Sequence, residues 1–568
     1  MGKRIIVDPI TRIEGHLKIE CEVSGGKVVN AWSSAQMFRG IEIILQGRDP
    51  RDAPLFVQRS CGVCTYTHYL SSMRAVEDAV GVTIPKNARI IRNLLHGAQF
   101  QQDHVTHFYQ LHALDFVDVV NALKADPKKT AADPKKTAAL SDNVSNDPHG
   151  GTAYFKEVQQ QIKTFVDSGQ LGLFSNGFVD SGQLGLFSNG YWGSPAYKLP
   201  PEANLMATAH YLEALRIQAK MVRMHAIFGA KNPHLQALAV GGITSVKDLT
   251  PDRIAEFLYI WKEAQAFVEN VYIPDLVTIA SFYKDWGAIG GTSNFLAWGD
   301  LPMGNKEPES LFLPRGVIMK RDLKGIKMAN PDKVTEHIDR SWYEKGKALH
   351  PYDGVTKPVK ADPKYDTNAQ YSWSKAPRYE GEACEVGPLA RVLVAYAYGK
   401  KNFTSVVDST LKKLNIPVTA LFSTLGRTAA RGLETLVIGN AMEGWVMELV
   451  ENLKSGDTAT CAKWTMPDKG KGCGLNDVAR GALGHWVEIE DKKIKNYQYV
   501  VPSTWNLGPR CEKGKLGPVE EALIGTPVDD PKRPLEILRT VHSFDPCIAC
   551  GVHVIDPDSN QVYKIKVV

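Results

Sequence analysis

The pattern of apolar and polar positions predicts strands at the start of the chain and long helices in its middle. Residues 16–23 alternate as a strand does, a Ser-Gly-Gly-Lys turn follows, and residues 28–32 complete a hairpin within residues 4–33. From Pro85 to about Leu123, apolar residues recur every three to four positions, which indicates one long helix that begins at a proline. The same spacing predicts helices over residues 202–228, 251–283 and 417–453.

Two other stretches lack this periodicity. Residues 301–378 are rich in Pro, Lys, Asp and Gly, and we expect a surface excursion that contains short strands rather than a separate domain. The last hundred residues are predicted to form short strands and turns. Together these patterns predict a mixed α and β fold, with a central bundle of long helices and small peripheral sheets.

Two segments occur twice in tandem without a single change. Residues 125–131 recur as 132–138, and residues 165–177 recur as 178–190. Architectural repeats diverge, occur three or more times and have periods of about 20–50 residues. We therefore interpret 125–138 and 165–190 in one of two ways. Each is either a very recent duplication or, as we favour, one loop whose residues appear twice in the sequence because two of its conformers were written one after the other. In the second case the two copies should superimpose in space.

Composition and charge exclude several classes of protein. Apolar residues make up 43% and charged residues 23% of the 568 residues, a globular balance. The net charge of +5 is too dilute along the chain to predict a nucleic-acid partner. We predict no transmembrane segment, because no apolar run approaches the roughly 18 residues that one needs. The N-terminus has no apolar core of the secretory type.

Four of the nine cysteines form two Cys-x-x-Cys pairs near opposite ends of the chain, Cys61/Cys64 and Cys547/Cys550. Two such pairs supply four soft ligands, which suits a closed structural zinc site or a catalytic transition-metal centre. A redox dithiol would explain one pair but not both. The spacing alone leaves these three readings open.

The residues around the pairs narrow the choice. The first pair stands in Arg59-Ser-Cys61-Gly-Val-Cys64-Thr-Tyr-Thr-His68, and the second in Asp545-Pro-Cys547-Ile-Ala-Cys550-Gly-Val-His553. Together they resemble the large subunit of nickel–iron hydrogenases, most closely the periplasmic uptake type. The resemblance extends over residues 4–553 and includes Arg12-Ile-Glu14-Gly-His16, Phe38-Arg39-Gly40-Ile-Glu42, Ala479-Arg480-Gly481 and Val501-Pro-Ser503-Thr504.

This resemblance implies a metal centre between the two cysteine pairs. Cys61 and Cys547 would be terminal nickel ligands, while Cys64 and Cys550 would bridge nickel to an iron that carries carbon monoxide and cyanide. The reaction implied is the reversible heterolytic cleavage of H2 into two protons and two electrons. Cys547 would receive the proton first, and Glu14 would accept it from there.

Further roles follow from the same resemblance. Arg480 would lie over the open face of the metals, oriented by Asp103 and Asp545. Ser503 would bond a cyanide and His68 a bridging sulfur. Glu42, the Tyr499 carbonyl and His553 resemble the ligands of a magnesium site. Water molecules would complete its oxygen-rich coordination shell. We expect the neighbouring residues His104 and His107 to be core histidines rather than metal ligands.

The resemblance also implies processing and partners. The family's mature large subunit ends at the histidine that corresponds to His553, so 554–568 would be a maturation peptide removed by an endopeptidase, leaving residues 1–553 as a single large catalytic domain. The chain has no cysteine array for iron–sulfur clusters, so we expect a heterodimer with an iron–sulfur small subunit. That subunit would pass electrons to a cytochrome or other acceptor and would carry the signal for export to the periplasm. A cytoplasmic location is the alternative.

Two rival functions remain. One is a non-catalytic hydrogenase-like subunit, although such relatives lack the full set of four cysteines. The other is a structural protein stapled by zinc. Elemental analysis separates them, because zinc without nickel and iron would contradict the hydrogenase interpretation.

Overall fold

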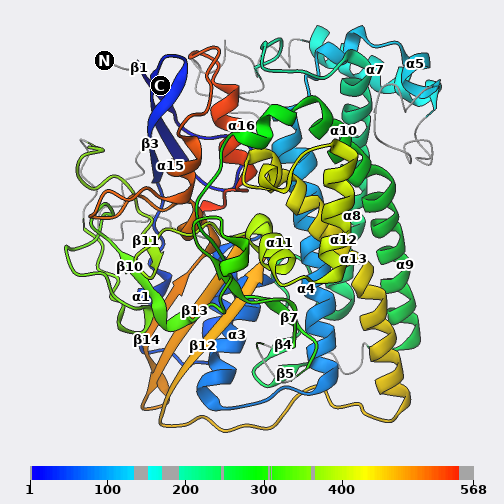
Figure 1. Cartoon of the computed structure of the whole chain (residues 1–568). Helices are drawn as coiled ribbons and strands as arrows, with labels where there is room; N and C mark the ends of the chain where they lie inside the picture. The colour runs from blue at the N-terminus through cyan, green and yellow to red at the C-terminus, as the bar shows by residue number, and fades with distance from the viewer. Residues whose placement is uncertain are drawn as a thin grey trace.

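Long helices form one side of the molecule, and small sheets and loops form the other (Figure 1). This computed structural model describes residues 3–132, 151–168, 191–244, 249–304, 308, 310–359 and 365–548. Residues 133–138 and 169–190, which make up most of the repeated segments, lie outside the described residues, as do Cys550, His553 and the tail 554–568. The expectation that the copies superimpose therefore stays a prediction.

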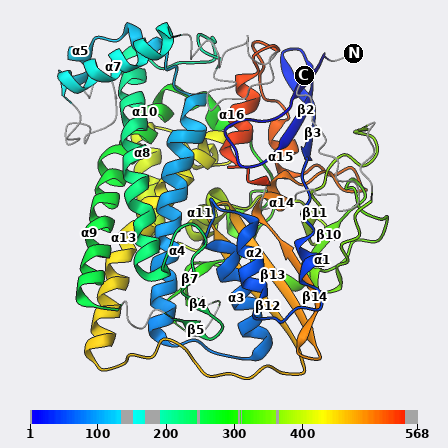
Figure 2. The ribbon, with the colours of Figure 1, turned by 180° about the vertical axis from the view of Figure 1, so that it is seen from behind.

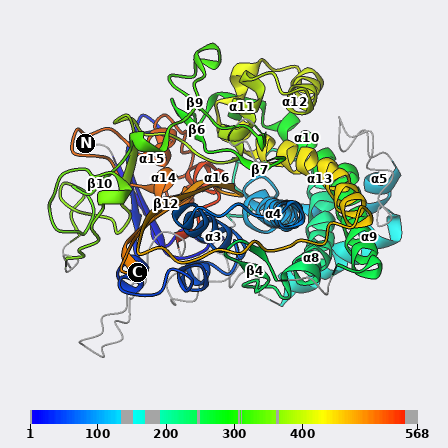
Figure 3. The same cartoon turned by 90° about the horizontal axis from the view of Figure 1, so that it is seen from below.

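The helical side is built around α4 (Lys86–Thr106), which packs against α8 (Pro201–Gly229) and α13 (Thr424–Lys454). Seen from below, α4 lies between α3 (Thr67–Val80) and the pair formed by α8 and α13 (Figure 3). The outer helix α9 (Pro251–Phe267) covers α8 and α13. The facing side chains of these helices form the largest buried apolar cluster of the described residues. The predicted helix over residues 202–228 is confirmed.

Three of the predicted helices have other ends or an interruption. The helix expected to reach Leu123 stops being α-helical at Thr106, where a π-helical turn, His107–His112, and a 3-10 turn, Ala113–Asp115, take over. The predicted helix 251–283 is two α-helices, α9 and α10 (Ile273–Phe282), joined by a π-turn, Val268–Tyr272. The helix predicted from Pro417 begins only at Thr424, since Ser423 caps it by accepting the Gly426 N–H at 2.9 Å. A π-turn rotates the following side chains by inserting one residue, a change that apolar spacing does not reveal.

The predicted N-terminal hairpin is confirmed and gains a third strand. Strands β1 (Lys3–Val7), β2 (Leu17–Ser24) and β3 (Lys27–Ala35) form an antiparallel sheet in that order. Their buried residues pack with the C-terminal helices α15 (Pro518–Leu523) and α16 (Leu535–Ser543) in one apolar cluster. Both views of the ribbon place this sheet beside those helices (Figures 1 and 2). This packing brings the N-terminal sheet next to the last described helices.

The last hundred residues hold longer strands than the sequence pattern predicts. Strands β12 (Lys469–Val478), β13 (Gly481–Glu490) and β14 (Lys493–Val500) form an antiparallel sheet against α3. The α3 backbone lies directly on β12: a Cβ atom added to Gly474 would meet the Ser71 carbonyl oxygen at 2.0 Å. The prediction of short strands and turns was wrong here, since the strands are 8 to 10 residues long and the same stretch also forms the helices α14 (Pro502–Leu507), α15 and α16. The glycines that allow the close approach of α3 also break the alternating pattern.

Shorter elements complete the fold. Within residues 301–378, the described part contains strands of three or four residues, including β8 (Leu311–Leu313), β9 (Gly316–Ile318), β10 (Val334–His337) and β11 (Ala376–Tyr379), with β7 (Asp300–Pro302) at its start. The remaining elements are α1 (Ile41–Leu45), α2 (Ala53–Val57), α5 (Pro127–Ala132), α7 (Thr152–Asp167), α11 (Pro388–Ala397), α12 (Lys401–Leu414), α14 (Pro502–Leu507), β4 (Leu238–Ala239), β5 (Gly242–Ile243) and β6 (Phe295–Ala297). The mixed α and β fold is confirmed. Among the described helices, none is both long and apolar enough to cross a bilayer.

Candidate metal centre

Three cysteines from opposite ends of the chain meet in the interior. Cys61 follows the 3-10 turn Gln58–Ser60, Cys64 lies just before α3, and Cys547 follows α16. The Sγ atoms of Cys61 and Cys547 lie 3.5 Å apart, and those of all three cysteines lie within 4.8 Å of one another. Their side chains are buried, and the Cys64 N–H points to the Cys61 sulfur at 3.2 Å.

This spacing fits ligands of a common metal centre. A disulfide would need about 2.05 Å between sulfurs, so Cys61 and Cys547 are not bonded to each other. Sulfurs that each lie about 2.3 Å from a tetrahedral metal are separated by distances of the size observed here. The predicted fourth ligand, Cys550, lies outside the described residues.

Glu14 contacts the Cys547 sulfur. The Cys547 thiol donates to Glu14 Oε2 at 3.3 Å, and backbone hydrogen bonds hold the two segments parallel. The Ile548 N–H donates to the Glu14 carbonyl at 2.8 Å, and the Glu14 N–H donates to the Pro546 carbonyl at 3.4 Å. Because Glu14 is only half-buried, its carboxylate lies between the buried sulfur and the surface.

Arg480 lies beside the sulfurs and is held by two carboxylates. Its Nη1 lies 3.4 Å from Asp103 Oδ2, and its Nη2 lies 3.0 Å from Asp545 Oδ1. Burial opposes its charge, but the two carboxylates and the nearby thiols keep the Arg480 pKa well above its usual range. Burial also raises the pKa of Asp103 to about 7, although Arg480 works against that shift. The guanidinium is therefore fixed in both orientation and charge.

A small cavity adjoins Cys64. It is lined by Cys64, Thr67, His68, Val478, Arg480, Leu483, Val501, Pro502 and Ser503. Val478, Leu483, Val501 and Pro502 supply its apolar walls, and the polar side chains in the lining include Arg480 and Ser503 beside Thr67 and His68. Ser503 Oγ also accepts the Cys547 N–H at 3.1 Å, so α14 is tied directly to the cysteine segment.

His68 is backed by a histidine that the sequence analysis did not single out. His68 Nδ1 lies 3.2 Å from His485 Nε2, and His485 Nδ1 lies 2.7 Å from the Tyr497 hydroxyl. Burial lowers the pKa of His68 to about 4, so its imidazole is neutral near pH 7. His485 comes from β13, and no local motif marks it. The predicted core histidines behave as expected: His104 Nε2 bonds Glu434 at 2.9 Å, and His107 Nε2 bonds the His542 carbonyl at 2.7 Å.

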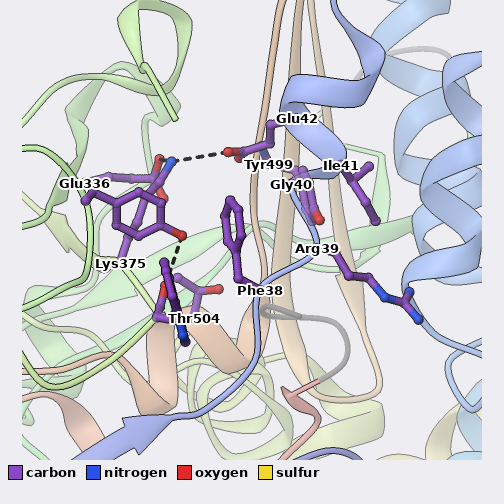
Figure 4. A pocket seen from close by; sticks show the side chains of 11 residues that line it. Phe38, Arg39, Gly40, Ile41, Glu42, Glu336, Lys375, Tyr499 and Thr504 are labelled. Atoms are coloured by element: carbon purple, nitrogen blue, oxygen red, sulfur yellow. Dashed lines mark hydrogen bonds and ion pairs between the residues drawn. The ribbon is translucent and has the colours of Figure 1, made fainter. Parts of the chain in front are cut away.

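The predicted magnesium ligands Glu42 and Tyr499 also lie together, in a small pocket that Glu336 and Lys375 line as well (Figure 4). Tyr499 also packs against the buried cluster that contains the three cysteines. Glu42 Oε1 accepts the Tyr499 N–H at 3.2 Å. The Lys375 ammonium lies 3.1 Å from Glu336 and 3.5 Å from Glu42. Burial opposes this charge, but the two carboxylates raise the Lys375 pKa. Glu336 and Lys375 were not predicted as part of this site, and His553 lies outside the described residues.

Comparison with known proteins gives consistent matches over the chain. A family model described as nickel-dependent hydrogenase matches residues 39–181 and 176–553, and one described as HoxL-like matches residues 4–31. The chain is 49% identical, over 601 aligned positions, to the uptake hydrogenase large subunit of Bradyrhizobium diazoefficiens, covering 100% of this chain and 98% of that protein. It is 44% identical over 605 positions to the hydrogenase-1 large chain of Escherichia coli, covering 100% and 97%.

Solved structures match as well. The chain superimposes with a TM-score of 0.76 and 34% identity on a [NiFeSe]-hydrogenase structure from Desulfomicrobium baculatum, covering 97% of this chain and 100% of that chain. The values are the same for a Ni-Fe-Se hydrogenase of Desulfovibrio vulgaris Hildenborough.

Proposed function

The chain belongs to the nickel-dependent hydrogenase family, and from this premise we propose that its paired cysteines hold a nickel–iron centre whose released proton passes to Glu14. The protein is a hydrogenase large subunit, an oxidoreductase that acts on H2. The observation that carries the proposal is the convergence of three buried thiols with the Glu14 carboxylate 3.3 Å from Cys547 Sγ. Cys550 is proposed as the fourth ligand.

The donor set fits such a centre. Thiolates are soft ligands that suit nickel and low-valent iron. The apolar walls of the adjoining cavity suit small neutral ligands such as carbon monoxide, while Arg480 and Ser503 offer hydrogen bonds to cyanide. When bound, the centre would supply the heterolytic cleavage of H2. A zinc staple would not need a buried guanidinium or a carboxylate directed at one thiol.

The proton path starts at Cys547. Its sulfur would hold the proton, and Glu14 Oε2 would accept it, since a general base acts at hydrogen-bonding distance. Arg480 would remain charged throughout, because Asp103 and Asp545 hold it, and would stabilise negative charge near the sulfurs. His68, which is itself bonded to His485, would orient a bridging sulfur.

A magnesium ion is proposed near the pocket lined by Glu42 and Tyr499, held by Glu42, the Tyr499 carbonyl and His553. The support is the group of buried carboxylates, Glu42 and Glu336, gathered there. Magnesium keeps several waters, and Lys375, Glu336 and Gln498 would hold these waters by hydrogen bonds.

Partners and processing complete the proposal. An iron–sulfur small subunit would take the electrons, pass them to a cytochrome or other acceptor and carry the signal for export to the periplasm. Removal of 554–568 by an endopeptidase would leave His553 as the C-terminus, so that Cys547 and Cys550 could be enclosed without a charged tail. Intact-mass measurement tests this step: an active, nickel-loaded heterodimer that retains 554–568 would contradict it.

Metal analysis tests the centre itself. The purified heterodimer should contain nickel and iron, and Cys61→Ser should lose nickel. Cys21→Ser is a matched control, because Cys21 is equally buried but lies in β2 away from the other thiols. Zinc without nickel in the wild-type protein, or full nickel in the Cys61 variant, would contradict the proposal.

A further inference from the structure

A fully buried carboxylate, Asp115, joins three positively charged or protonatable groups outside the metal centre. Its Oδ1 accepts from Arg12 Nη2 at 2.5 Å. Its Oδ2 faces His542 Nδ1 at 2.7 Å and His112 Nδ1 at 3.1 Å. All four side chains are buried. Neither the cysteine motifs nor the proposed function gives this cluster a role.

His542 bonds through both of its ring nitrogens. Its Nε2 lies 2.8 Å from the Thr11 carbonyl, which can only accept, so this nitrogen carries a hydrogen. Its Nδ1 faces the Asp115 carboxylate, which can only accept while it is ionised. Burial alone would raise the pKa of Asp115, but Arg12 and His542 hold it well below its usual range. Each ring nitrogen of His542 therefore faces an acceptor oxygen, Nδ1 the Asp115 carboxylate and Nε2 the Thr11 carbonyl.

The same hydrogen bonds exclude a metal ion between His112, Asp115 and His542, although their ligand atoms lie within 4.8 Å of one another. Arg12 occupies one carboxylate oxygen and both histidines donate to the other. A metal needs those lone pairs, and it would also lie against the Arg12 guanidinium. The cluster is therefore an ion network.

The network ties together the two segments that meet at the proposed proton acceptor. Arg12 precedes Glu14 by two residues and adopts a left-handed backbone, with φ of 55°, while its Nη1 donates to the Leu111 carbonyl at 2.7 Å. His542 lies at the end of α16, just before the segment that carries Cys547. Asp115 thus binds Arg12, which is close to Glu14 in sequence, and His542, which is close to Cys547 in sequence.

We propose that Arg12, Asp115 and His542 form a clamp that sets the distance between Glu14 and Cys547, with His542 as a positioning residue that bonds an acceptor through each ring nitrogen. The proposal rests on the proposed role of Glu14 as proton acceptor. Arg12 and His542 both bind Asp115. Loss of either bond therefore lets the segment that carries Glu14 shift relative to the segment that carries Cys547.

Neutron diffraction on the wild-type heterodimer tests the protonation directly. Deuterium should appear on both Nδ1 and Nε2 of His542. Deuterium on one nitrogen alone would overturn the clamp, because His542 could then hold only one of its two acceptors.

The variant His542→Gln tests the positioning. We expect the metal content to stay normal, the Cys547 Sγ to Glu14 distance to lengthen in a crystal structure, and H/D exchange to fall by about 10- to 100-fold, the loss typical of a small misplacement of a reacting group. His210→Gln is the matched control, because His210 is also buried and bonds a carboxylate, Asp275, at 2.8 Å. An unchanged distance with unchanged exchange, or an equal loss in the His210 variant, would overturn the proposal.

The variant Glu14→Gln separates this inference from the proposed function. If Glu14→Gln abolishes exchange while His542→Gln leaves it unchanged, the clamp is wrong and the acceptor stands. If Glu14→Gln has no effect on exchange, the acceptor itself is wrong, and a lengthened Cys547–Glu14 distance in His542→Gln would still support the clamp.

Discussion

Replacing Glu14 with glutamine removes the only property that the proposed proton path requires of this residue. Glutamine has nearly the same size and can still accept a hydrogen bond from the Cys547 thiol, now 3.3 Å from Oε2. It cannot take up the proton. The metal ligands and the backbone bonds that hold the segment are not altered by the change.

The expected loss of rate follows from the proposed role of Glu14 as a general base. A positioned general base contributes about 10²- to 10⁴-fold to a rate, and each tenfold step corresponds to about 1.4 kcal/mol of barrier. Glu14→Gln should therefore raise the barrier to proton transfer by about 3–5 kcal/mol. Stability should change little, within about 0.5 kcal/mol, because Glu14 is only half-buried.

The assay compares H/D exchange and dye reduction by metal-replete heterodimers at matched nickel content. Asp8→Asn is the control, since Asp8 is an exposed carboxylate of the same N-terminal segment and bonds His16 at 2.6 Å. Both rates should fall in the Glu14 variant and stay normal in the control. Near-normal rates in Glu14→Gln would show that another group takes the proton from Cys547.

Three further predictions concern the site and its scaffold. Arg480→Lys should keep nickel and iron but lose at least about tenfold in turnover, since an ammonium cannot span Asp103 and Asp545 as the planar guanidinium does; wild-type turnover would refute this. Gly474→Ala should destabilise the subunit by about 1–3 kcal/mol in thermal denaturation, because its Cβ would meet the Ser71 carbonyl oxygen at 2.0 Å; Gly444→Ala, with open space at Cβ and an ordinary backbone conformation in α13, controls for steric contact. Asp300, buried beside Arg74 and His96, has a pKa below its usual range, although burial alone would raise it. Its contribution to stability is present above pH of about 4 and is lost as the pH falls, so the Tm deficit of Asp300→Asn should be largest near neutral pH and shrink on acidification, and a constant deficit would contradict this.

Local patterns were sufficient for the features whose signal lies in neighbouring residues. The Cys61 and Cys547 motifs, the hairpin at β2 and β3 and the helix α8 are each written in a short stretch of sequence, because ligand spacing and side-chain periodicity are local properties. The helix ends were less predictable. The π-turn after Thr106 inserts a residue without changing the apolar character of the stretch. It ends at His112, which bonds Asp115, and Asp115 in turn bonds Arg12.

Only the tertiary structure decided which residues far apart in the sequence form ion pairs or hydrogen bonds. His485 reaches His68 from β13, and His542 reaches Asp115 from α16, across hundreds of intervening residues. Lys375 likewise meets Glu42 only because a loop of the surface excursion folds back on α1. His68 and Glu42 stand in motifs, but the sequence does not mark their partners His485 and Lys375, since a buried ion needs a partner nearby in space but not nearby in sequence. The sequence by itself determined which side chains could bind metal. The packing of the N-terminal segment against the last described residues determined which hydrogen bonds and ion pairs surround these side chains.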